Sequence, residues 1–487
     1  MTKYVLGIDI GTSFSCVAFG DDSGRGVRAK VLRLMGDKGL VSSVVLYDSD
    51  DKPIAFGKEA VEKYIAGNGK NIIREFKMDL GKRISKGDFD IESEDVYETF
   101  LDYLKQEIEK WLGEKMESGR VCITHPADES KKIGERVTTI AEKVFKGFKI
   151  VSIEESSAVV QFIDQQQGLL TINPQKVLVL DSGGGTTDFS LAIAQYRFYV
   201  FKQPLEIIRT GRVNVGGRNV DEKIYEKIKE KLQNNGYSSN PLDREKALRK
   251  IRLEKEKYWS NWSTTNDHNF EFGAGISMSS DEFKECVRYV IDEIIKYARD
   301  LIEPERESKN PIQAIILAGG NSQIPILKEK LENEFALQVL PVPVFDIQTA
   351  IAKGAAIYAY SSNKRIRYNL RYDIYLQYPD PNEKPKLLWK RGEKVPTSKP
   401  KEILAKFTDS GDLIIKFKRD NTENDRVLEI RFDPPLKLNT EVKISFDIDA
   451  NGYLRYTAEA WGKEERRIFS DVIKKYLFDV SPPDWVV

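Results

Sequence analysis

The chain has 487 residues, enough for about three average domains or fewer large ones, each able to bury a core. Lysine plus arginine and aspartate plus glutamate both number 76, so no net field draws the chain toward nucleic acid or a membrane. Three widely spaced cysteines exclude a disulfide framework and a cysteine zinc site, and two histidines argue against histidine-based catalysis. With no signal peptide and no apolar run of about 18 residues, we expect a soluble, cytoplasmic protein.

The first predicted elements are two strands joined by a polar turn, in the sequence VLGIDIGTSFSCVAFG at residues 5–20. An apolar strand runs into Asp9, and Gly11, Thr12 and Ser13 precede a second strand at residues 16–19. A carboxylate followed by a glycine and hydroxyl groups is what a site for phosphate and a metal ion needs.

The same plan returns at residues 177–194, VLVLDSGGGTTDFSLAIA. Here Asp181 ends the strand, the three glycines let backbone N–H groups approach a ligand, and Thr186 adds a hydroxyl. A glycine-rich hairpin turn explains one copy equally well, but two copies form an internal repeat. Two such hairpins facing each other could hold a polyphosphate. Neither copy is a Walker loop, and neither opens a helix as a Rossmann fingerprint does.

Residues 1–362 alternate between strand and helix patterns, which predicts an α/β domain. We expect a helix cap at Ser279 or Ser280, with Glu282 as an early acid. The predicted strands cover residues 44–47, 120–124, 149–153, 177–180 and 314–317, and the predicted helices cover 97–112, 130–144, 220–233, 244–259, 280–302 and 323–335.

A third glycine motif, AIILAGGNSQIPILKEKL at residues 314–331, has a different form. A buried strand meets Gly319 and Gly320, and a helix is expected to begin after Asn321 or Ser322 with Pro325 in its first turn. Two glycines at this place would let a flat ring lie on the backbone, as at a nucleoside site. A tight turn between strand and helix explains the pair equally well.

The pattern changes after about residue 373. Apolar and polar residues alternate at 441–449 and at 413–417, and Asn451-Gly452 predicts a hairpin turn. The segment 447–452 resembles the start of a calcium loop, but Ala458 stands where a glutamate belongs, so a hairpin is expected. We predict an all-β sandwich at 373–487, joined by a linker at 363–372.

These motifs, in this order, resemble the superfamily of actin, sugar kinases and heat-shock ATPases. The closest resemblance is to the seventy-kilodalton heat-shock chaperone family, and it covers nearly the whole chain. GIDIGTSFSCVA and LDSGGGTTDFS look like its phosphate motifs, IVSIEESSAVVQ and IAKGAAIYA like its connecting helices, and ILAGGNSQIP like its adenosine motif. EVKISFDIDANGYL looks like its β-sandwich signature. The resemblance implies a two-lobed, actin-like ATPase domain followed by the sandwich.

The resemblance also implies ATP or ADP and Mg²⁺ as cofactors, with K⁺ as a second candidate cation. Asp9 and Asp181 would hold Mg²⁺ through waters, and Lys77, Glu154 and Thr186 would join them in catalysis. Without the resemblance, Lys77 reads as a solvated charge and Glu154 as one of two acids at a helix start. The implied nucleotide-binding residues are Gly11, Thr12, Ser13, Gly183, Gly184, Gly185, Thr186, Gly216, Gly217, Glu254, Lys257, Asn261, Gly319, Gly320, Asn321 and Gln323.

The implied function is that of an ATP-dependent chaperone of protein folding and the stress response. Slow ATP hydrolysis would accompany binding of unfolded or extended apolar polypeptides, with co-chaperones as further partners. Leu413 and Ile415 are candidates for the peptide groove, although a sandwich core needs the same alternation. Two alternatives remain: an ATP-binding co-chaperone or exchange factor with little hydrolysis, and a small-molecule kinase of the superfamily.

Several positions depart from the family pattern. Glu155 replaces a proline, Arg218 replaces an acid, and Gln323 replaces an arginine expected to stack on adenine. The linker lacks a run of leucines and carries Arg365, Arg367 and Arg371, which predicts weak communication between the domains. Few residues follow Trp461, so no helical lid is expected.

Overall fold

The computed structural model describes most of the chain and all three glycine motifs. The described residues are 4–22, 27–34, 39–86, 88–127, 132–163, 175–194, 205–238, 240–261, 269–272, 275–342, 346–360, 366–369, 373–377, 386–390, 393–395, 401–406, 413–419, 426–430, 441–448, 454–461 and 466–473.

The chain divides into two compact units. The first comprises Met1–Asp128, Lys132–Phe201 and Thr210–Ser362, and the second comprises Glu129–Lys131, Lys202–Arg209 and Asn363–Val487. The first unit is a mixed α/β structure, and it carries every element of the candidate site. The ATPase domain, linker and sandwich boundaries expected at 362 and 372 stay predictions.

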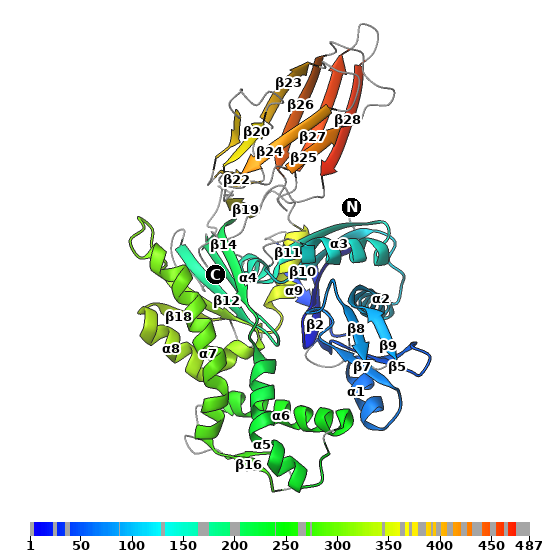
Figure 1. The fold of residues 1–487 in the computed structure, drawn as a ribbon, viewed down its shortest axis with the longest axis vertical. Helices are drawn as coiled ribbons and strands as arrows, with labels where there is room; N and C mark the ends of the chain where they lie inside the picture. Colours follow the sequence, from blue (N-terminus) through cyan, green and yellow to red (C-terminus); the bar gives the residue numbers. More distant parts are fainter. Residues whose placement is uncertain are drawn as a thin grey trace. The chain divides into compact units, whose positions relative to one another are not determined.

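The first large sheet of unit one has the strand order β11-β10-β1-β2-β3, with β4 also paired to β2. Figure 1 labels β2, β10 and β11 of this sheet. Strand β1 is antiparallel to β2 and parallel to β10, which is itself parallel to β11. All seven residues of β1 are buried, which explains its apolar run. The strands are β1 (Tyr4–Ile10), β2 (Phe14–Asp22), β3 (Val27–Val31), β4 (Leu40–Ser42), β10 (Gly119–His125) and β11 (Phe148–Glu154).

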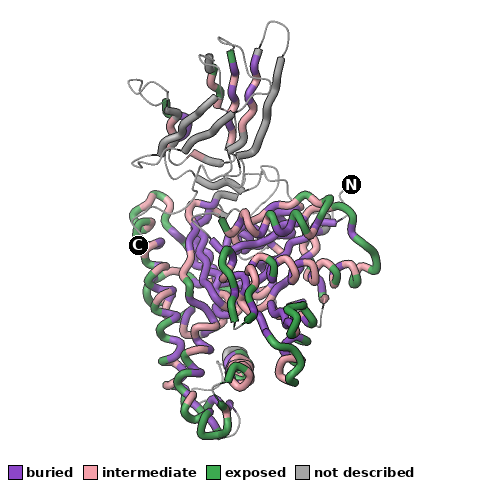
Figure 2. Tube along the Cα trace, turned by 45° about the vertical axis from the view of Figure 1, so that its right-hand side comes forward, coloured by how far each residue is buried: buried purple, intermediate pink, exposed green. Residues whose placement is uncertain are grey.

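Helices α2 (Ser93–Leu112) and α3 (Lys132–Val144) bury their apolar faces in the core of this sheet. Figure 2 shows buried residues along the strands of this unit and exposed residues on its outer helices. Smaller elements complete this half of the unit: β5 (Val44–Tyr47), β6 (Pro53–Phe56), α1 (Gly57–Ile65), β7 (Asn71–Arg74), β8 (Arg83–Lys86) and β9 (Phe89–Glu92).

The second large sheet carries the strands β18-β17-β12-β13-β14 in that order. Strand β12 is antiparallel to β13 and parallel to β17, and β17 is parallel to β18. Its strands are β12 (Gln175–Ser182), β13 (Thr187–Ala194), β14 (Leu205–Val213), β17 (Ala314–Ala318) and β18 (Gln338–Pro341). This half also holds α5 (Gly217–Asn234), α6 (Pro241–Asn261), β15 (Phe270–Glu271), β16 (Ser277–Met278), α7 (Ser280–Ile302), η2 (Glu303–Glu305), η3 (Gly320–Gln323) and α8 (Pro325–Phe335).

Two buried helices rich in small residues, α4 (Glu155–Ile163) and α9 (Ala350–Tyr360), pack against each other. A Cβ at Gly354 of α9 would clash with the carbonyl oxygen of Ala158, so the two backbones approach closely there. Helix α9 lies equally close to β1, because a Cβ at Gly7 would clash with the backbone of Ala352. Neither helix has a polar outer face, which explains why periodicity alone does not predict them.

The second unit consists of strands wherever the structure describes residues after 363. Residues Leu205–Ile207 of β14 pair in parallel with β19 (Ile366–Asn369), which pairs with β22 (Lys394–Val395). One antiparallel sheet has the order β21-β20-β24-β25, and another has the order β23-β26-β27-β28. The bounds are β20 (Ile374–Gln377), β21 (Lys386–Trp389), β23 (Lys401–Lys406), β24 (Leu413–Arg419), β25 (Arg426–Ile430), β26 (Glu441–Ile448), β27 (Leu454–Trp461) and β28 (Arg466–Ile473).

Val442, Ile444 and Phe446 of β26 are buried, as their alternation predicts. Strands β26 and β27 pair antiparallel with Ile448 opposite Leu454, which confirms the hairpin predicted there. Its turn, 449–453, lies outside the described residues. That the two antiparallel sheets form a sandwich stays a prediction.

The structure confirms the predicted helix and strand types in the first unit and corrects some ends. Ser279 caps α7: Glu282 N donates to its Oγ at 3.3 Å, and its own N–H donates to Glu282 Oε2 at 2.9 Å. Helix α8 begins at Pro325 rather than directly after Ser322, because residues 320–323 form a 3₁₀ turn first.

Candidate functional site

Two polar hairpin turns face each other in the first unit. The β1–β2 turn holds Gly11–Ser13, and the β12–β13 turn holds Gly183–Thr186. A Cβ at Gly184 would clash with Ser13 Oγ, and a Cβ at Gly185 would lie 2.9 Å from Thr12 Cγ2. The absence of side chains at both glycines therefore allows this close approach of the two turns. The arrangement is the one that the internal repeat predicts.

Four buried carboxylates lie close to these turns: Asp9, Glu155, Asp181 and Asp188. Asp9 Oδ1 accepts a hydrogen bond from Thr124 Oγ1 at 2.7 Å. Asp188 accepts one from Ala127 N and one from Thr186 Oγ1, both at 2.8 Å. Asp181 is opposite Asp188 in the β12–β13 register, and its Oδ1 is buried with no hydrogen-bond partner among the described residues.

The electrostatics of this cluster show a surplus of negative charge. Burial raises the pKa of Asp9 to about 6, with Lys77 acting against the shift and Glu155 adding to it. Burial, together with Glu155, raises the pKa of Asp188 to about 7. The pKa of Asp181 is raised by burial first and then by the charges of Glu155, Asp188 and Asp9. A cation placed among these groups would reverse each of these shifts.

Asp9 and Asp181 suit a hard cation such as Mg²⁺, because both offer buried carboxylate oxygens at the turns. The partnerless Oδ1 of Asp181 is free to accept from a coordinated water. The described residues contain no group of three or more histidine, cysteine, aspartate or glutamate side chains arranged around one point. A cation held mainly through waters fits this sparse set of protein ligands.

Lys77 is buried in the same cluster and forms an ion pair with Glu155 Oε1. Burial lowers the pKa of Lys77, but Glu155 and Asp9 oppose it, so the net shift is upward. Lys77 is therefore a protonated ammonium group beside the two turns. The solvated position expected without the resemblance is wrong, because only 4% of the residue is exposed.

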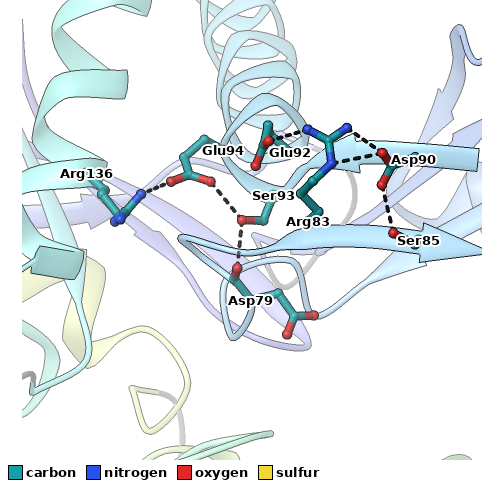
Figure 3. A network of polar contacts seen from close by, with 8 residues as sticks. All are labelled: Asp79, Arg83, Ser85, Asp90, Glu92, Ser93, Glu94 and Arg136. Atoms are coloured by element: carbon teal, nitrogen blue, oxygen red, sulfur yellow. Dashed lines mark hydrogen bonds and ion pairs between the residues drawn. The ribbon is translucent and has the colours of Figure 1, made fainter.

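A polar network fixes the turn that carries Lys77 (Figure 3). Ser93, the first residue of α2, places its Oγ 2.7 Å from the carbonyl oxygen of Asp79 and 2.9 Å from Glu94 Oε2. Glu94 in turn pairs with Arg136 of α3. Within the β8–β9 hairpin, Arg83 Nε donates to Asp90 Oδ2 at 2.9 Å. The start of α2 thus holds the turn two residues after Lys77.

Glu154 is the last residue of β11 and lies opposite His125 in the parallel register. It is half-buried, and its Oε2 has no hydrogen-bond partner among the described residues. This oxygen is a buried acceptor without a partner in the described part of the chain, one residue before Glu155 of the cluster, and such an acceptor calls for an ordered water molecule.

The glycine pair before α5 contacts the second turn directly. Gly217 N donates to Gly183 O at 3.0 Å, and Arg218 N donates to Gly184 O at 2.7 Å. A Cβ at Gly216 would lie 2.6 Å from Gly183 O. The start of α5 is therefore part of the same site.

The strand–glycine–glycine segment adjoins the second turn from the other side. Gly319 has φ 80°, and a Cβ there would clash with Ser182 O and with Asp181 Oδ1. Asn321 Nδ2 donates to Ser182 Oγ at 2.8 Å, while Asn321 Oδ1 is buried with no hydrogen-bond partner among the described residues. Gly320 and half-buried Gln323 belong to the 3₁₀ turn η3.

The residues predicted on α6 differ in how they approach the site. Glu254 and Lys257 form an ion pair at 3.8 Å, and 65% of the Lys257 side chain is exposed. Lys255 is buried instead: its Nζ donates to Gly217 O at 2.8 Å and lies 2.5 Å from Asp221 Oδ1. Asn261 is the last residue of α6, and its side chain lies outside the described residues, as do the side chains of Leu413 and Ile415 on β24.

Sequence reasoning did not assign site roles to Glu155, Asp188 or Lys255. Lys255 had a signal, because Ala247, Ile251 and Lys255 follow at helical spacing and all three are buried. Asp188 could have been assigned from its place across the hairpin from Asp181. The pairing of Glu155 with Lys77 had no local signal, because 78 residues separate them.

The chain matches one protein family over more than half its length. The sequence profile described as Hsp70 protein matches residues 85–367. No helix among the described residues is both long and apolar enough to span a membrane.

Curated relatives align with most of this chain at 24–26% identity. The chain is 26% identical to Chaperone protein DnaK of Mycoplasma mobile over 368 residues. The aligned residues cover 72% of this chain and 57% of that protein. The chain is 25% identical over 370 residues to Chaperone protein DnaK of Mycoplasma mycoides subsp. mycoides SC, and 24% identical over 371 residues to that of Mesomycoplasma hyopneumoniae. The aligned residues cover 72–73% of this chain and 58% of these two relatives. The chain thus spans less than two thirds of the length of the relatives it matches.

Proposed function

This chain belongs to the Hsp70 family, and we propose that it is an ATP-dependent chaperone that binds ATP with Mg²⁺ and hydrolyses it slowly. The observation that carries the proposal is the pair of facing turns, Gly11–Ser13 and Gly183–Thr186, with buried carboxylates and a buried lysine beside them. Backbone N–H groups, hydroxyls, a lysine and carboxylates for a cation are the parts that phosphoryl transfer needs.

In this proposal the triphosphate lies against both turns. Hydroxyls of Thr12, Ser13 and Thr186 and backbone N–H groups of the glycines donate to its phosphate oxygens. The adenosine lies toward Gly319 and Gly320, as the strand–glycine–glycine motif predicts. Mg²⁺, held through waters by Asp9 and Asp181, supplies neutralisation of phosphate charge when it is bound.

Hydrolysis then requires an oriented water and a cation at the transferring phosphoryl group. Glu154 is assigned to the water, because its Oε2 has no hydrogen-bond partner among the described residues. Lys77 neutralises charge on the γ-phosphoryl oxygens. The water oxygen forms a bond to the γ-phosphorus while the bond to the β,γ-bridging oxygen breaks, which yields ADP and phosphate.

The second unit is proposed to bind extended apolar polypeptides. Its support is the family membership and the pairs of antiparallel strands that the described residues form. The buried alternation on β26 belongs to a core, so peptide contacts are sought elsewhere, with Leu413 and Ile415 of β24 as the candidates.

A second candidate function is that of an ATP-binding co-chaperone or exchange factor that hydrolyses little. The ion pair between Lys77 and Glu155 favours this candidate, because the lysine assigned to hydrolysis already has a partner. Steady-state ATPase assays with and without an unfolded polypeptide separate the two. A chaperone shows slow hydrolysis that the polypeptide stimulates, whereas a co-chaperone binds ATP with hydrolysis near background. Absence of nucleotide binding contradicts both.

A further inference from the structure

In the Lys77–Glu155 ion pair, the ammonium group that would bind the triphosphate is already bound to a carboxylate. The pair is almost fully enclosed, with 3% of the lysine side chain and 9% of the glutamate side chain exposed. A buried pair of this kind is held together strongly, because neither charge can be resolvated without moving. Any phosphate that engages Lys77 must therefore compete with Glu155.

The site has more buried carboxylates than buried ammonium groups, so displacing Glu155 from Lys77 lowers the affinity for ATP. Asp9, Asp181, Asp188 and Glu155 contribute four buried carboxylates, and Lys77 is the buried ammonium group that pairs directly with one of them. The carboxylate of Glu155 lies beside the two turns, because it pairs with the buried Lys77 there. Its negative charge would repel the oxygens of a γ-phosphate.

We propose that Glu155 is a specificity-determining residue that competes with the γ-phosphate of ATP for Lys77 and so weakens the preference of the site for ATP over ADP. This inference rests on the proposed function, in which Lys77 contacts the γ-phosphoryl group. ADP lacks that group and leaves the ion pair in place. ATP must displace the carboxylate, and part of its extra binding energy is consumed in doing so.

Two substitutions of Glu155 test the proposal, because the residue begins a helix and both keep the geometry of the helix start. Either one leaves Lys77 buried without its partner, so a lower free energy of unfolding is expected in both variants. Glu155 is the first residue of α4, where a helix needs no particular side chain and accepts even proline. Glu155→Gln keeps the shape and removes the charge. Glu155→Pro supplies the residue found in the family pattern, and it serves as a second variant should the glutamine fold poorly.

The experiment measures dissociation constants of MgADP and of a nonhydrolysable Mg-ATP analogue by calorimetry for the wild type and both variants. We expect about tenfold tighter binding of the ATP analogue in either Glu155 variant, with the ADP constant changed less than threefold. In the double variant Lys77→Gln, Glu155→Gln the gain over Lys77→Gln alone is expected to be smaller than in the single Glu155 variants, because the competition for Lys77 is gone and only the direct repulsion between Glu155 and the γ-phosphate is relieved. A ratio of ATP to ADP affinity that is unchanged in folded Glu155 variants overturns the proposal.

The matched control is Glu305→Gln. Glu305 pairs with Lys176 at 2.7 Å in a similarly enclosed ion pair, with 14% and 10% of the side chains exposed, and neither residue belongs to the site. The Glu305→Gln variant reports any general effect of removing an enclosed ion pair. Its ratio of ATP to ADP affinity is expected to stay that of the wild type. Failure of the wild type to bind either nucleotide would remove the proposed function itself, and with it this inference. If the wild type binds both nucleotides and the Glu155 variants keep its ratio of affinities, only the proposed role of Glu155 is contradicted.

Discussion

Gly184 and Ser13 belong to different hairpins, yet the backbone of one lies against the side chain of the other. A Cβ added at Gly184 would clash with Ser13 Oγ and lie 3.1 Å from Ser13 Cβ. The neighbouring Gly183 has room, since the nearest atom to an added Cβ is Thr186 O at 3.6 Å. The close approach of the two hairpins therefore depends on Gly184, together with Gly185 beside Thr12, and not on Gly183.

Gly184→Ala is expected to lower the free energy of unfolding by about 1–3 kcal/mol in the absence of nucleotide, as overpacking does in close contacts. Gly183→Ala is the matched control, because neither glycine has a positive φ and only Gly184 lacks space. Alanine at 183 should leave stability within about 1 kcal/mol of the wild type or raise it. Urea denaturation followed by circular dichroism measures both, and equal losses would contradict the close approach.

Lys77→Ala is expected to reduce ATP hydrolysis about a hundredfold or more while nucleotide still binds, because it removes a positive charge at the transferring phosphoryl group. Single-turnover hydrolysis and calorimetric titration measure the two effects separately. Lys176→Ala, which removes a similarly buried lysine away from the turns, serves as the control and should retain hydrolysis. Unchanged hydrolysis in the Lys77 variant would exclude the role assigned to it.

The Lys77–Glu155 ion pair should also affect the free energy of unfolding. Removing Lys77 alone leaves Glu155 buried without its partner, which costs about 3–5 kcal/mol. Replacing both residues with apolar ones, as in Lys77→Met with Glu155→Leu, should recover most of that loss. A double-mutant cycle by chemical denaturation gives the coupling directly. A coupling near zero would mean that the two charges are not enclosed together.

A second ion pair connects the Lys77 turn to α5. Glu75, which has φ 60°, pairs with Arg218, whose backbone N–H donates to Gly184 O. The two side chains are about one third exposed, so the pair contributes about 1 kcal/mol to stability at most. The same free energy in a barrier corresponds to about a fivefold change in rate. Arg218→Glu should therefore speed release of a fluorescent ADP by about fivefold. The charge swap Glu75→Arg with Arg218→Glu should restore the slow release, and identical rates in the single and swapped variants would contradict this connection.

Much of the first unit could be predicted from sequence because its elements carry strong local patterns. The span of α7 and the strand at residues 44–47 follow from periodicity and from the cap at Ser279. Helices α4 and α9 are enclosed on all sides, so they have no amphipathic pattern and only the family resemblance indicated them. The β8–β9 hairpin buries Ile84 and Phe89 in the core, but each of its strands has only four residues, which is too short for a clear alternation.

The candidate site divides in the same way. Its turns could be predicted because glycine and hydroxyl residues repeat after two apolar strands, whereas its charge pairing could not. Lys77 and Glu155 come together only because the Lys77 turn and the start of α4 are placed by different parts of the fold. Long-range pairs between single charged residues leave no trace in local spacing, so the structure was needed to identify them.

In the proposed function, the facing turns at Ser13 and Gly184 hold a nucleoside triphosphate with Mg²⁺. Calorimetric titration of the full chain with ATP, in Mg²⁺ and again in excess chelator, tests it most directly. We expect saturable binding at one site in Mg²⁺ that weakens at least tenfold in chelator, because Asp9 and Asp181 then face the phosphates without a cation between them. Absence of saturable binding in Mg²⁺, or binding of equal strength in chelator, would contradict it.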